Sequence, residues 1–522
     1  MKTYDGAAFE RFCAGLINEG FSPVRETEQR WWTGPLRPSL QPLTDATRMQ
    51  ICFYSGWPFR YAHVTVPGLR AEHAPQGTIC LWAEDDPAQI AGRDLQVLWD
   101  RLDEWAATAQ RGFRTEDRGL DSYLLFEKQN KYQAELPFGD LIRRGNNGYL
   151  APLTAFRRGE RALIIESGEA PQADDDKPRL KGAFYLRRDI GSSPRDLDQI
   201  RAALTHRQTK DLERGLAART PAELAEPSGG YDFIVLAWPR HDREHDAVIV
   251  GFESQGASLL TTAMAATPND IAARKRRAGP DVDLLDGKTV LVAGVGSVGG
   301  HVAVALASSG VGTVITHDND YLKSGNLVRH VCPEYLVGYR KTLAVSMVIE
   351  DHAPWTNVKQ REELPHDPGK LAAQIEGADL IVDCTGVFSL TAALAEICRR
   401  NAVPLITGAL YHRGALARIQ RQADGDTPIA ARTTNPAYMD LPSEDPSALQ
   451  ARFLELGCTA PVNNAPPVAV LSTAVEIAHA AIDILTGRRH RTDERIVVFR
   501  PLQPPFDRTG TFDALRPETG NP

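Results

Sequence analysis

The strongest constraint on the fold is a short apolar run that leads directly into a glycine-rich turn. Lys288 to Ala293 contains T-V-L-V-A, and Gly294, Gly296 and Gly299 follow in G-V-G-S-V-G-G. An apolar helix is predicted next, through residues 302–307. Glycines let a backbone approach a phosphate closely, and the first turn of a helix offers unpaired N–H groups to its charge. The pattern predicts a nucleotide-binding turn.

A second strand is predicted over residues 312–316, and it ends at Asp318 and Asp320. Strand, glycine turn, helix and strand form one βαβ unit of a Rossmann-like α/β fold. An acid at the end of the second strand suits a ribose hydroxyl. By itself this pattern does not separate NAD, FAD and ATP.

The residues that follow favour ATP over a dinucleotide. S-G-N-L-V-R contains Asn326 and Arg329, and G-Y-R-K ends at Lys341. Three phosphates and a magnesium ion need fixed cations, whereas a dehydrogenase has no use for an Arg and a Lys just past its ribose-binding acid. A nicotinamide oxidoreductase stays open as a rival interpretation. If the residues have no function, Arg329 and Lys341 form ordinary ion pairs on the surface.

A later strand, over residues 379–382, ends at Asp383. Open α/β sheets bind ligands at the carboxyl ends of their strands, and a carboxylate there is a ligand that Mg²⁺ accepts. Asp383 is therefore a candidate magnesium ligand.

Residues 286–500 resemble the adenylation domain shared by ubiquitin-activating enzymes and the bacterial sulfur-carrier activators ThiF and MoeB. The matching elements are G-V-G-S-V-G, D-N-D-Y-L-K-S-G-N-L-V-R, G-Y-R-K and V-D-C-T-G. The resemblance implies ATP and Mg²⁺ as cofactors, with the ribose on Asp318 and the metal near Asp383. It also implies a homodimer, in which one basic residue of Arg274 to Arg277 reaches the partner subunit's ATP. The phosphates would lie against Asn326, Arg329 and Lys341.

The chain is long enough for roughly three to four domains. It has 522 residues, of which 42% are hydrophobic and 24% charged, with a net charge of −8. We expect an α+β domain over 1–150, a connector over 151–270 and the adenylation domain over 271–522. The charge gives no support for nucleic-acid binding. No stretch has the ~20 apolar residues of a membrane span, and no secretory signal precedes the first helix, which predicts a cytoplasmic protein.

The first domain resembles the ubiquitin-conjugating fold. The matching stretches are F-R-Y-x-x-V-x-V-P from Phe59 to Pro67 and H-x-x-x-G-T-I-C-L from His73 to Leu81. The resemblance places the catalytic cysteine at Cys80. The asparagine that conjugating enzymes place upstream of that cysteine is absent, because Glu72 to Pro75 reads E-H-A-P. The oxyanion-stabilising group is therefore unassigned, with His73 as a guess, and a buried core thiol is the alternative for Cys80.

The seven cysteines are scattered singly, without a Cys-x-x-Cys pair, so the sequence indicates neither a zinc ribbon nor a redox motif. Their odd number predicts a reducing compartment. Cys458 lies between Gly457 and Pro461, just ahead of the last long apolar helix. Activating enzymes carry a thioester cysteine after the magnesium aspartate, so Cys458 is the candidate nucleophile. The other five cysteines are assigned to packing.

The complete order of domains resembles the fused ligase of bacterial antiphage (CBASS or ubiquitin-like) operons. That resemblance implies adenylation of a partner's C-terminal carboxylate of the glycine type, transfer to Cys458 and then Cys80, and ligation to a target lysine. The partner would be a cGAS-like nucleotidyltransferase or a ubiquitin-like protein. Two alternatives remain: a sulfur-carrier adenylyltransferase, and an N-terminal domain that serves only for docking.

Overall fold

A computed structural model describes residues 4–25, 29–83, 86–113, 120, 122–168, 179–190, 193–239, 245–256, 258–432 and 465–513. The chain divides into two compact units, Met1–Asp270 and Ile271–Pro522. The boundary lies where the sequence analysis starts its third domain.

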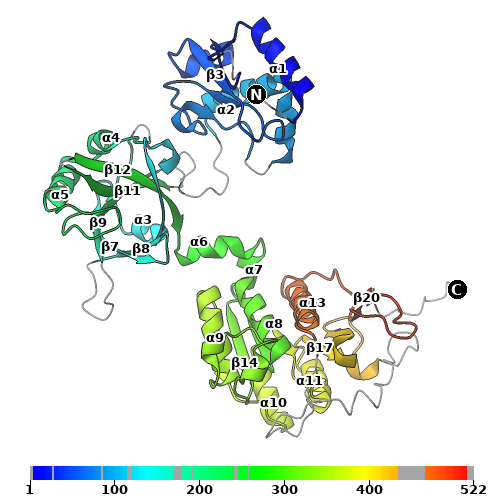
Figure 1. Ribbon diagram of the computed structural model, residues 1–522. Helices are drawn as coiled ribbons and strands as arrows, with labels where there is room; N and C mark the ends of the chain where they lie inside the picture. The colour runs from blue at the N-terminus through cyan, green and yellow to red at the C-terminus, as the bar shows by residue number, and fades with distance from the viewer. Residues whose placement is uncertain are drawn as a thin grey trace. The chain divides into compact units, whose positions relative to one another are not determined.

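The first unit begins with a small α+β fold (Figure 1). Five antiparallel strands follow one another in sheet order as they do along the chain. One apolar face of helix α1 and one of α2 cover the inner side of this sheet, where Phe12, Trp32, Ile51 and Trp99 are fully buried. The elements are α1 (Gly6–Asn18), β1 (Ser22–Pro23), β2 (Trp31–Pro35), β3 (Arg48–Cys52), β4 (His63–Thr65), β5 (Thr78–Ile79) and α2 (Leu95–Arg111).

The rest of the first unit is a closed barrel of seven strands, in the order β10-β11-β12-β6-β8-β7-β9. Apolar residues from all seven strands fill its interior, and a second apolar cluster lies under α4 and α5. Because β10 serves both clusters, it reads as a continuous apolar run. The elements are β6 (Gln129–Leu136), α3 (Phe138–Arg143), β7 (Leu150–Arg158), β8 (Ala162–Ser167), β9 (Leu180–Leu186), α4 (Leu197–Ala203), α5 (His206–Ala217), β10 (Phe233–Pro239), β11 (His245–Gln255) and β12 (Ser258–Pro268).

The predicted boundary at residue 150 does not coincide with the start of this barrel. Strand β6 pairs in parallel with both β8 and β12, so residues 129–136 already belong to it. The pairing of β6 with β12 joins segments more than one hundred residues apart, which local periodicity does not report.

The second unit is built on an eight-stranded sheet with the order β15-β14-β13-β16-β17-β18-β19-β20. The first five strands are parallel, and the last three add antiparallel. The elements up to β17 are α6 (Ile271–Lys275), α7 (Val282–Leu285), β13 (Thr289–Ala293), α8 (Ser297–Ser308), β14 (Thr313–His317), α9 (Lys341–His352), β15 (Asn357–Arg361), α10 (Pro368–Ile375), β16 (Leu380–Asp383), α11 (Phe388–Arg400) and β17 (Leu405–Tyr411). The elements after it are β18 (Leu416–Gln422), α13 (Pro467–Leu485), β19 (Glu494–Val498) and β20 (Gly510–Asp513).

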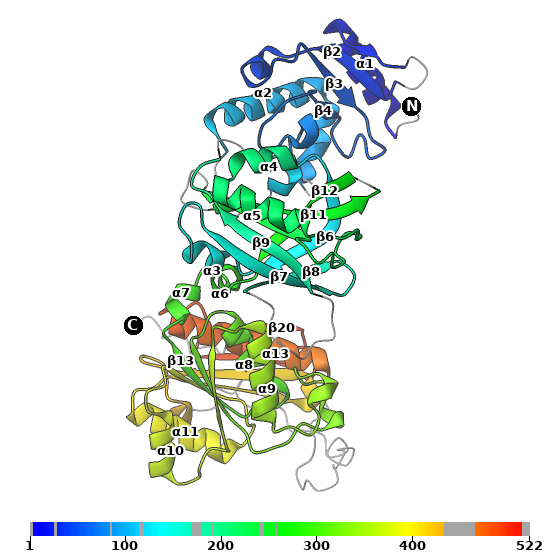
Figure 2. The same cartoon turned by 90° about the vertical axis from the view of Figure 1, so that its left-hand side faces the viewer.

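Helices cover both faces of this sheet (Figure 2). Val290 and Val292 of β13 face the cluster made with α8, α9 and α13, whereas Leu291 and Ala293 face α10 and α11. This alternation makes the second unit a three-layered, doubly wound α/β fold. It confirms the Rossmann-like fold expected for the C-terminal half.

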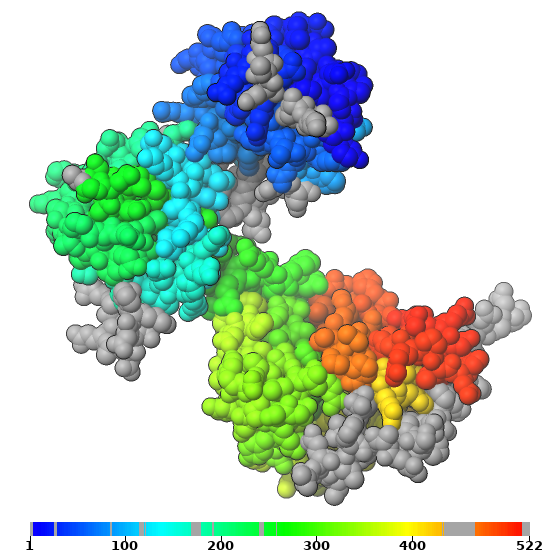
Figure 3. All heavy atoms as spheres, in the orientation of Figure 1, coloured from blue at the N-terminus to red at the C-terminus, as the bar shows by residue number. Residues whose placement is uncertain are grey.

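Helix α13 is the one helix, among the described residues, that is long and apolar enough to cross a membrane. Its Ile477 and Ala481 are fully buried in the core shared with α8. Its outer side, with the strands that follow, forms one side of the unit in the space-filling view (Figure 3). Strand β20 pairs with β19 and forms the last strand of the sheet.

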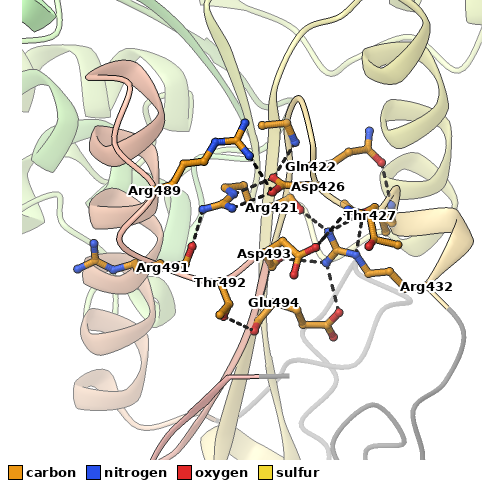
Figure 4. Close-up of polar contacts among 12 residues, drawn as sticks. Arg421, Gln422, Asp426, Thr427, Arg432, Arg489, Arg491, Thr492, Asp493 and Glu494 are labelled. Atoms are coloured by element: carbon orange, nitrogen blue, oxygen red, sulfur yellow. Dashed lines mark hydrogen bonds and ion pairs between the residues drawn. The ribbon is translucent and has the colours of Figure 1, made fainter. Parts of the chain in front are cut away.

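A network of buried ion pairs joins β18 to β19 (Figure 4). Arg421 binds both carboxylate oxygens of Asp426 at 2.8 Å, and Arg432 contacts Glu494 at 3.2 Å. Breaking one partner of such a buried pair costs about 3–5 kcal/mol, since the other charge is left without compensation. The network therefore holds residues 423–432 firmly on the sheet.

Candidate functional site

The glycine turn, Asp318 and Asp383 lie at one edge of the sheet, where β13 has β14 on one side and β16 on the other. Gly294 has φ +77°, and a Cβ on Gly299 would lie 1.8 Å from the Gly294 carbonyl oxygen. Both positions therefore require glycine. A Cβ on Gly296 would meet nothing within 4 Å, so the space before the N-terminus of α8 is open. This is the geometry of a phosphate-binding turn at a topological switch point.

The Asp318 carboxylate accepts hydrogen bonds from the backbone N–H groups of Val295 (3.0 Å) and Asp320 (2.9 Å). Desolvation by burial raises its pKa, and the Lys341 ammonium opposes that rise. Lys341 is the first residue of α9, and its Nζ lies 2.7 Å from Oδ2 of the exposed Asp320. Asp318 therefore ties the glycine turn to the Asp320 loop, and Asp320 orients Lys341.

A pocket of about 260 Å³ opens between these elements. Asn326, Arg329 and Lys341 all line it, although fifteen positions separate the first from the last. The backbone N–H of Arg329 donates to the Asn326 carbonyl at 2.9 Å, so residues 326–329 form one tight turn beside the pocket. Sequence analysis assigned no role in the site to five of its lining residues, which are Ser297, Val298, His330, Cys384 and Thr385.

Asp383 is 1% exposed, and its two oxygens accept hydrogen bonds from threonines that follow it. Thr385 donates from its N–H (3.0 Å) and its hydroxyl (2.7 Å) to Oδ1, and Thr391 donates to Oδ2. Thr385 and Cys384 line the pocket. In this conformation Asp383 acts on the pocket by orienting Thr385. A metal role for Asp383 stays a prediction.

His330 is 7% exposed and accepts the Cys332 N–H at Nδ1 (3.2 Å), so its Nε2–H donates to the Val295 carbonyl (3.0 Å). Desolvation lowers its pKa to about 4, helped by the Lys341 charge. His330 is therefore neutral at neutral pH and holds the glycine turn through Val295.

This shift predicts a loss of stability in mild acid. Between pH 6.5 and about pH 4, His330 is protonated in the unfolded chain and neutral in the folded protein, because its pKa is 6.5 when unfolded and about 4 when folded. We expect this residue to remove about 2 kcal/mol from the free energy of unfolding between pH 7 and pH 5. Urea unfolding of the wild type and of His330→Asn at both pH values measures the difference. An equal loss of stability in the wild type and in the variant would contradict the prediction. Such a loss would come from other buried histidines, such as His301 and His317, whose pKa values burial also lowers and which both proteins contain.

The basic run from Arg274 to Arg277 is partly engaged within its own unit. Arg274 donates to the carbonyls of Asp351 (2.7 Å) and His352 (3.2 Å) at the C-terminus of α9, and Lys275 pairs with Asp286. Arg276 and Arg277 are exposed. The reach of this run into a partner subunit stays a prediction.

Cys80 is the one exposed thiol among the six cysteines of the described residues. It follows β5 directly and lines a pocket of about 510 Å³ with aromatic walls and one ion pair, Arg101–Glu104. The buried-core interpretation of Cys80 is therefore wrong. The pocket residues that the sequence did not point to are Trp82, Ala83, Arg101, Glu104, Trp105, Thr108 and Phe113.

The packing assignment of the other cysteines agrees with their burial. Cys13, Cys52, Cys332 and Cys398 are buried and Cys384 is half-buried. Desolvation raises the pKa of each of these thiols. Cys458 lies outside the described residues. Within the described ranges, no three His, Cys, Asp or Glu side chains are grouped as metal ligands would be.

The geometry of the second unit agrees with a comparison to known families. Residues 276–511 match the ThiF family. The chain is 31% identical over 127 residues to the molybdopterin-synthase adenylyltransferase of Haemophilus influenzae, covering 24% of this chain and 51% of that one. It is 24% identical over 161 residues to the ATP-dependent ubiquitin transferase-like protein Cap2 of Vibrio cholerae, covering 30% and 27%.

A crystal structure of E. coli MccB aligns with 46% of this chain and 69% of its own, at 19% identity and a TM-score of 0.36. The chain spans only 37% and 24% of the length of two further curated relatives, the proteins y4oA and y4qC of Sinorhizobium fredii. The C-terminal half thus carries a ThiF family domain. The likeness of the first domain to the ubiquitin-conjugating fold stays a prediction.

Proposed function

We propose that the second unit binds Mg-ATP and adenylates the C-terminal carboxylate of a partner protein. The observation that carries the proposal is the pocket that brings Asn326, Arg329 and Lys341 against the open N-terminus of α8. Two cations and a helix N-terminus suit a polyphosphate, and Asp318 at the next strand end suits its ribose. The ThiF family match over the same residues supports this assignment.

In the proposed reaction the partner's carboxylate oxygen attacks the α-phosphorus of ATP. The bond from that phosphorus to the bridging oxygen breaks, pyrophosphate leaves, and an acyl-adenylate remains. Arg329 and Lys341 stabilise the negative charge that grows on the phosphate oxygens. Asp320 holds Lys341 in place through its 2.7 Å contact.

Asp383 is the residue that would hold Mg²⁺. Magnesium binds in such sites through one or two carboxylates, the substrate phosphates and water, and one carboxylate beside the pocket fits that donor set. Bound there, the ion would neutralise phosphate charge. A carboxylate has lone pairs beyond those that Thr385 and Thr391 occupy.

Asp383→Asn tests this role, since the amide keeps the volume of the side chain and loses its charge. We expect the Mg²⁺ concentration that half-saturates ATP–pyrophosphate exchange to rise roughly 10- to 100-fold. The measurement is exchange at increasing Mg²⁺, with Asp283→Asn on the exposed side of α7 as the control. A lower rate with an unchanged Mg²⁺ requirement would instead assign Asp383 to positioning Thr385.

We further propose that the acyl group passes from the adenylate to Cys458, then to Cys80, and then to a lysine of a target protein. The exposed thiol of Cys80 in its pocket supports the second transfer. We propose a ubiquitin-like protein or a cGAS-like nucleotidyltransferase as the cargo. The printed name of the relative Cap2, a ubiquitin transferase-like protein, supports transfer chemistry of the ubiquitin kind. Two thiols in one chain share an effective concentration of roughly millimolar, so transfer needs no separate docking. We propose that the chain acts as a homodimer.

Calorimetric titration of the full chain with Mg-ATP and with NAD separates the nucleotide classes. We expect saturable binding of ATP and none of NAD. Binding of NAD without ATP would contradict adenylation and support an oxidoreductase. ATP binding with acyl transfer that ignores Cys80 would support the alternative, a sulfur-carrier adenylyltransferase with an N-terminal docking domain.

A further inference from the structure

We infer that the imidazole of His73 is the proton acceptor for the Cys80 thiol. The inference rests on the proposed role of Cys80 as an acyl carrier and adds a residue to it. His73 and Cys80 line the same pocket, although seven positions separate them. Covalent catalysis uses a nucleophile with a general base close by, and Cys80 and His73 would fill these two roles.

The loop before Cys80 holds His73 against it by backbone contacts. The Cys80 N–H donates to the His73 carbonyl at 2.8 Å, and the Val66 N–H donates to the Gly77 carbonyl at 2.8 Å. Gly77 has φ +78°, and a Cβ there would lie 2.2 Å from the Val66 carbonyl oxygen. Ala74, beside His73, is completely buried. The distance between His73 and Cys80 is therefore set by the fold.

His73 itself has φ +55°, in the left-handed region that few non-glycine residues adopt. Such a conformation costs of order 1–3 kcal/mol and persists where the surroundings enforce it, often at functional sites. The imidazole packs on Phe113 with ring centroids 4.5 Å apart, and Phe113 lines the pocket. The backbone turn and the ring contact together keep the imidazole at the pocket wall.

Cys80 needs a base because its thiol is not activated by its surroundings. Desolvation by the pocket walls raises its pKa above the ordinary value, so the thiol form predominates at neutral pH. The thiolate is the nucleophilic form. Attack at neutral pH therefore requires a group that accepts the proton as the sulfur bonds to carbon.

The other titratable groups near Cys80 are less suited to this task. Arg101 carries a permanent charge and pairs with Glu104 at 2.5 Å. The Tyr61 hydroxyl accepts the Leu81 N–H at 3.2 Å, and burial raises its pKa. His63 packs between Tyr54 and Tyr61, with ring centroids 4.4 and 5.2 Å away. His73 is the imidazole that lines the pocket.

The step balances without a further reactant. The Cys80 sulfur forms a bond to the carbonyl carbon of an incoming thioester while its proton moves to a ring nitrogen of His73. The carbon–sulfur bond to the first thiol then breaks, and the imidazolium returns the proton to the departing thiolate. A new thioester and a free thiol result.

The test uses the full chain and iodoacetamide, with modification of Cys80 followed by peptide mass. In the wild type we expect the alkylation rate of Cys80 to rise at a lower pH than ionisation of its own thiol would give, because a base in the pocket accepts the proton. His73→Asn keeps a side chain that tolerates positive φ but accepts no proton. We expect its rate at pH 7 to fall roughly 10- to 100-fold and to recover only as the thiol itself ionises. His63→Gln is the comparison and is expected to keep the wild-type profile.

A second variant guards against a structural explanation. His73→Gly adopts positive φ without strain and leaves space at the pocket wall, so added imidazole should restore the alkylation rate. An unchanged profile in His73→Asn, no rescue of His73→Gly, or the loss appearing in His63→Gln would each overturn the inference. Alkylation of Cys80 needs neither ATP nor a partner protein, so it tests the role of His73 independently of acyl transfer. If His73 controls the alkylation rate but no acyl group is ever found on Cys80, the inference holds and only the proposed function is contradicted.

Discussion

Replacement of Cys80 by alanine is expected to abolish the isopeptide-linked product and to leave ATP–pyrophosphate exchange at the wild-type rate. In the proposed function the two reactions use different pockets in different compact units, one lined by Cys80 and the other by Lys341. Cys80 is exposed, so its loss opens no cavity in the core. Both activities are measured on the same preparation, the ligated product by gel and mass spectrometry and the exchange by radioactive phosphate.

Cys80→Lys converts the same transfer into a trap. An amine at this position should attack the incoming thioester and keep the acyl group as a stable amide. Intact mass of the variant, co-expressed with the proteins of neighbouring genes, should increase by the mass of one partner chain. Thr108→Lys places a lysine in the same pocket, on α2, and is the matched control.

The outcomes of the trap separate the two functions that the chain supports. An adduct mapped to residue 80, and none at residue 108, establishes the relay and identifies the partner. Ligated product that survives Cys80→Ala would rule the relay out. A reducible adduct at Cys458 without one at residue 80 would favour the sulfur-carrier chemistry and a docking role for the first domain.

Lys341→Ala is expected to lower the rate of adenylation by about 10²–10³, the usual effect of removing one charge-stabilising donor from a preorganised site. Its side chain is 13% exposed and lines the pocket in which we propose that the phosphates bind. ATP affinity should fall as well, by roughly 10- to 100-fold, because a hydrogen bond to a charged group contributes about 1.5–3 kcal/mol.

Titration calorimetry with Mg-ATP and pyrophosphate exchange together measure the Lys341 effect. Lys370→Ala, at an exposed position of α10, removes an equal charge away from the pocket and should leave both values unchanged. If the two variants behave alike, net charge and not contact with the phosphates explains the loss. Asp320→Asn should reproduce part of the effect, since Asp320 orients the ammonium.

The strands and helices around the glycine turn were predictable because their signals are local. The apolar run ending at Ala293 becomes β13, and the predicted second strand becomes β14 with Asp318 directly after it. Each strand is buried on both faces, so its composition alone distinguishes it from a surface segment. The barrel was not recognised, because parallel pairs such as β6 with β12 join residues far apart in the sequence.

In each of the two pockets, some residues could be predicted from the sequence and others only from the structure. Spacing and residue type pointed to Arg329 and Lys341, whereas the resemblance to the ubiquitin-conjugating fold pointed to Cys80. Thr385 and His330 are ordinary residues in sequence, and only their hydrogen bonds to Asp383 and Val295 reveal what they do. His73 drew attention in the sequence only because the asparagine of conjugating enzymes is absent from that stretch. Its place beside Cys80 depends on the turn at Gly77, which the sequence does not reveal.

The sequence by itself determined the glycine turn and the two strands on either side of it, because these depend on residue types within a short stretch of chain. The tertiary structure decided which residues share a pocket, which carboxylate is buried and hydrogen-bonded, and which cysteine is exposed. Those properties arise when strands distant in sequence pair and exclude water, and local patterns contain no measure of that burial.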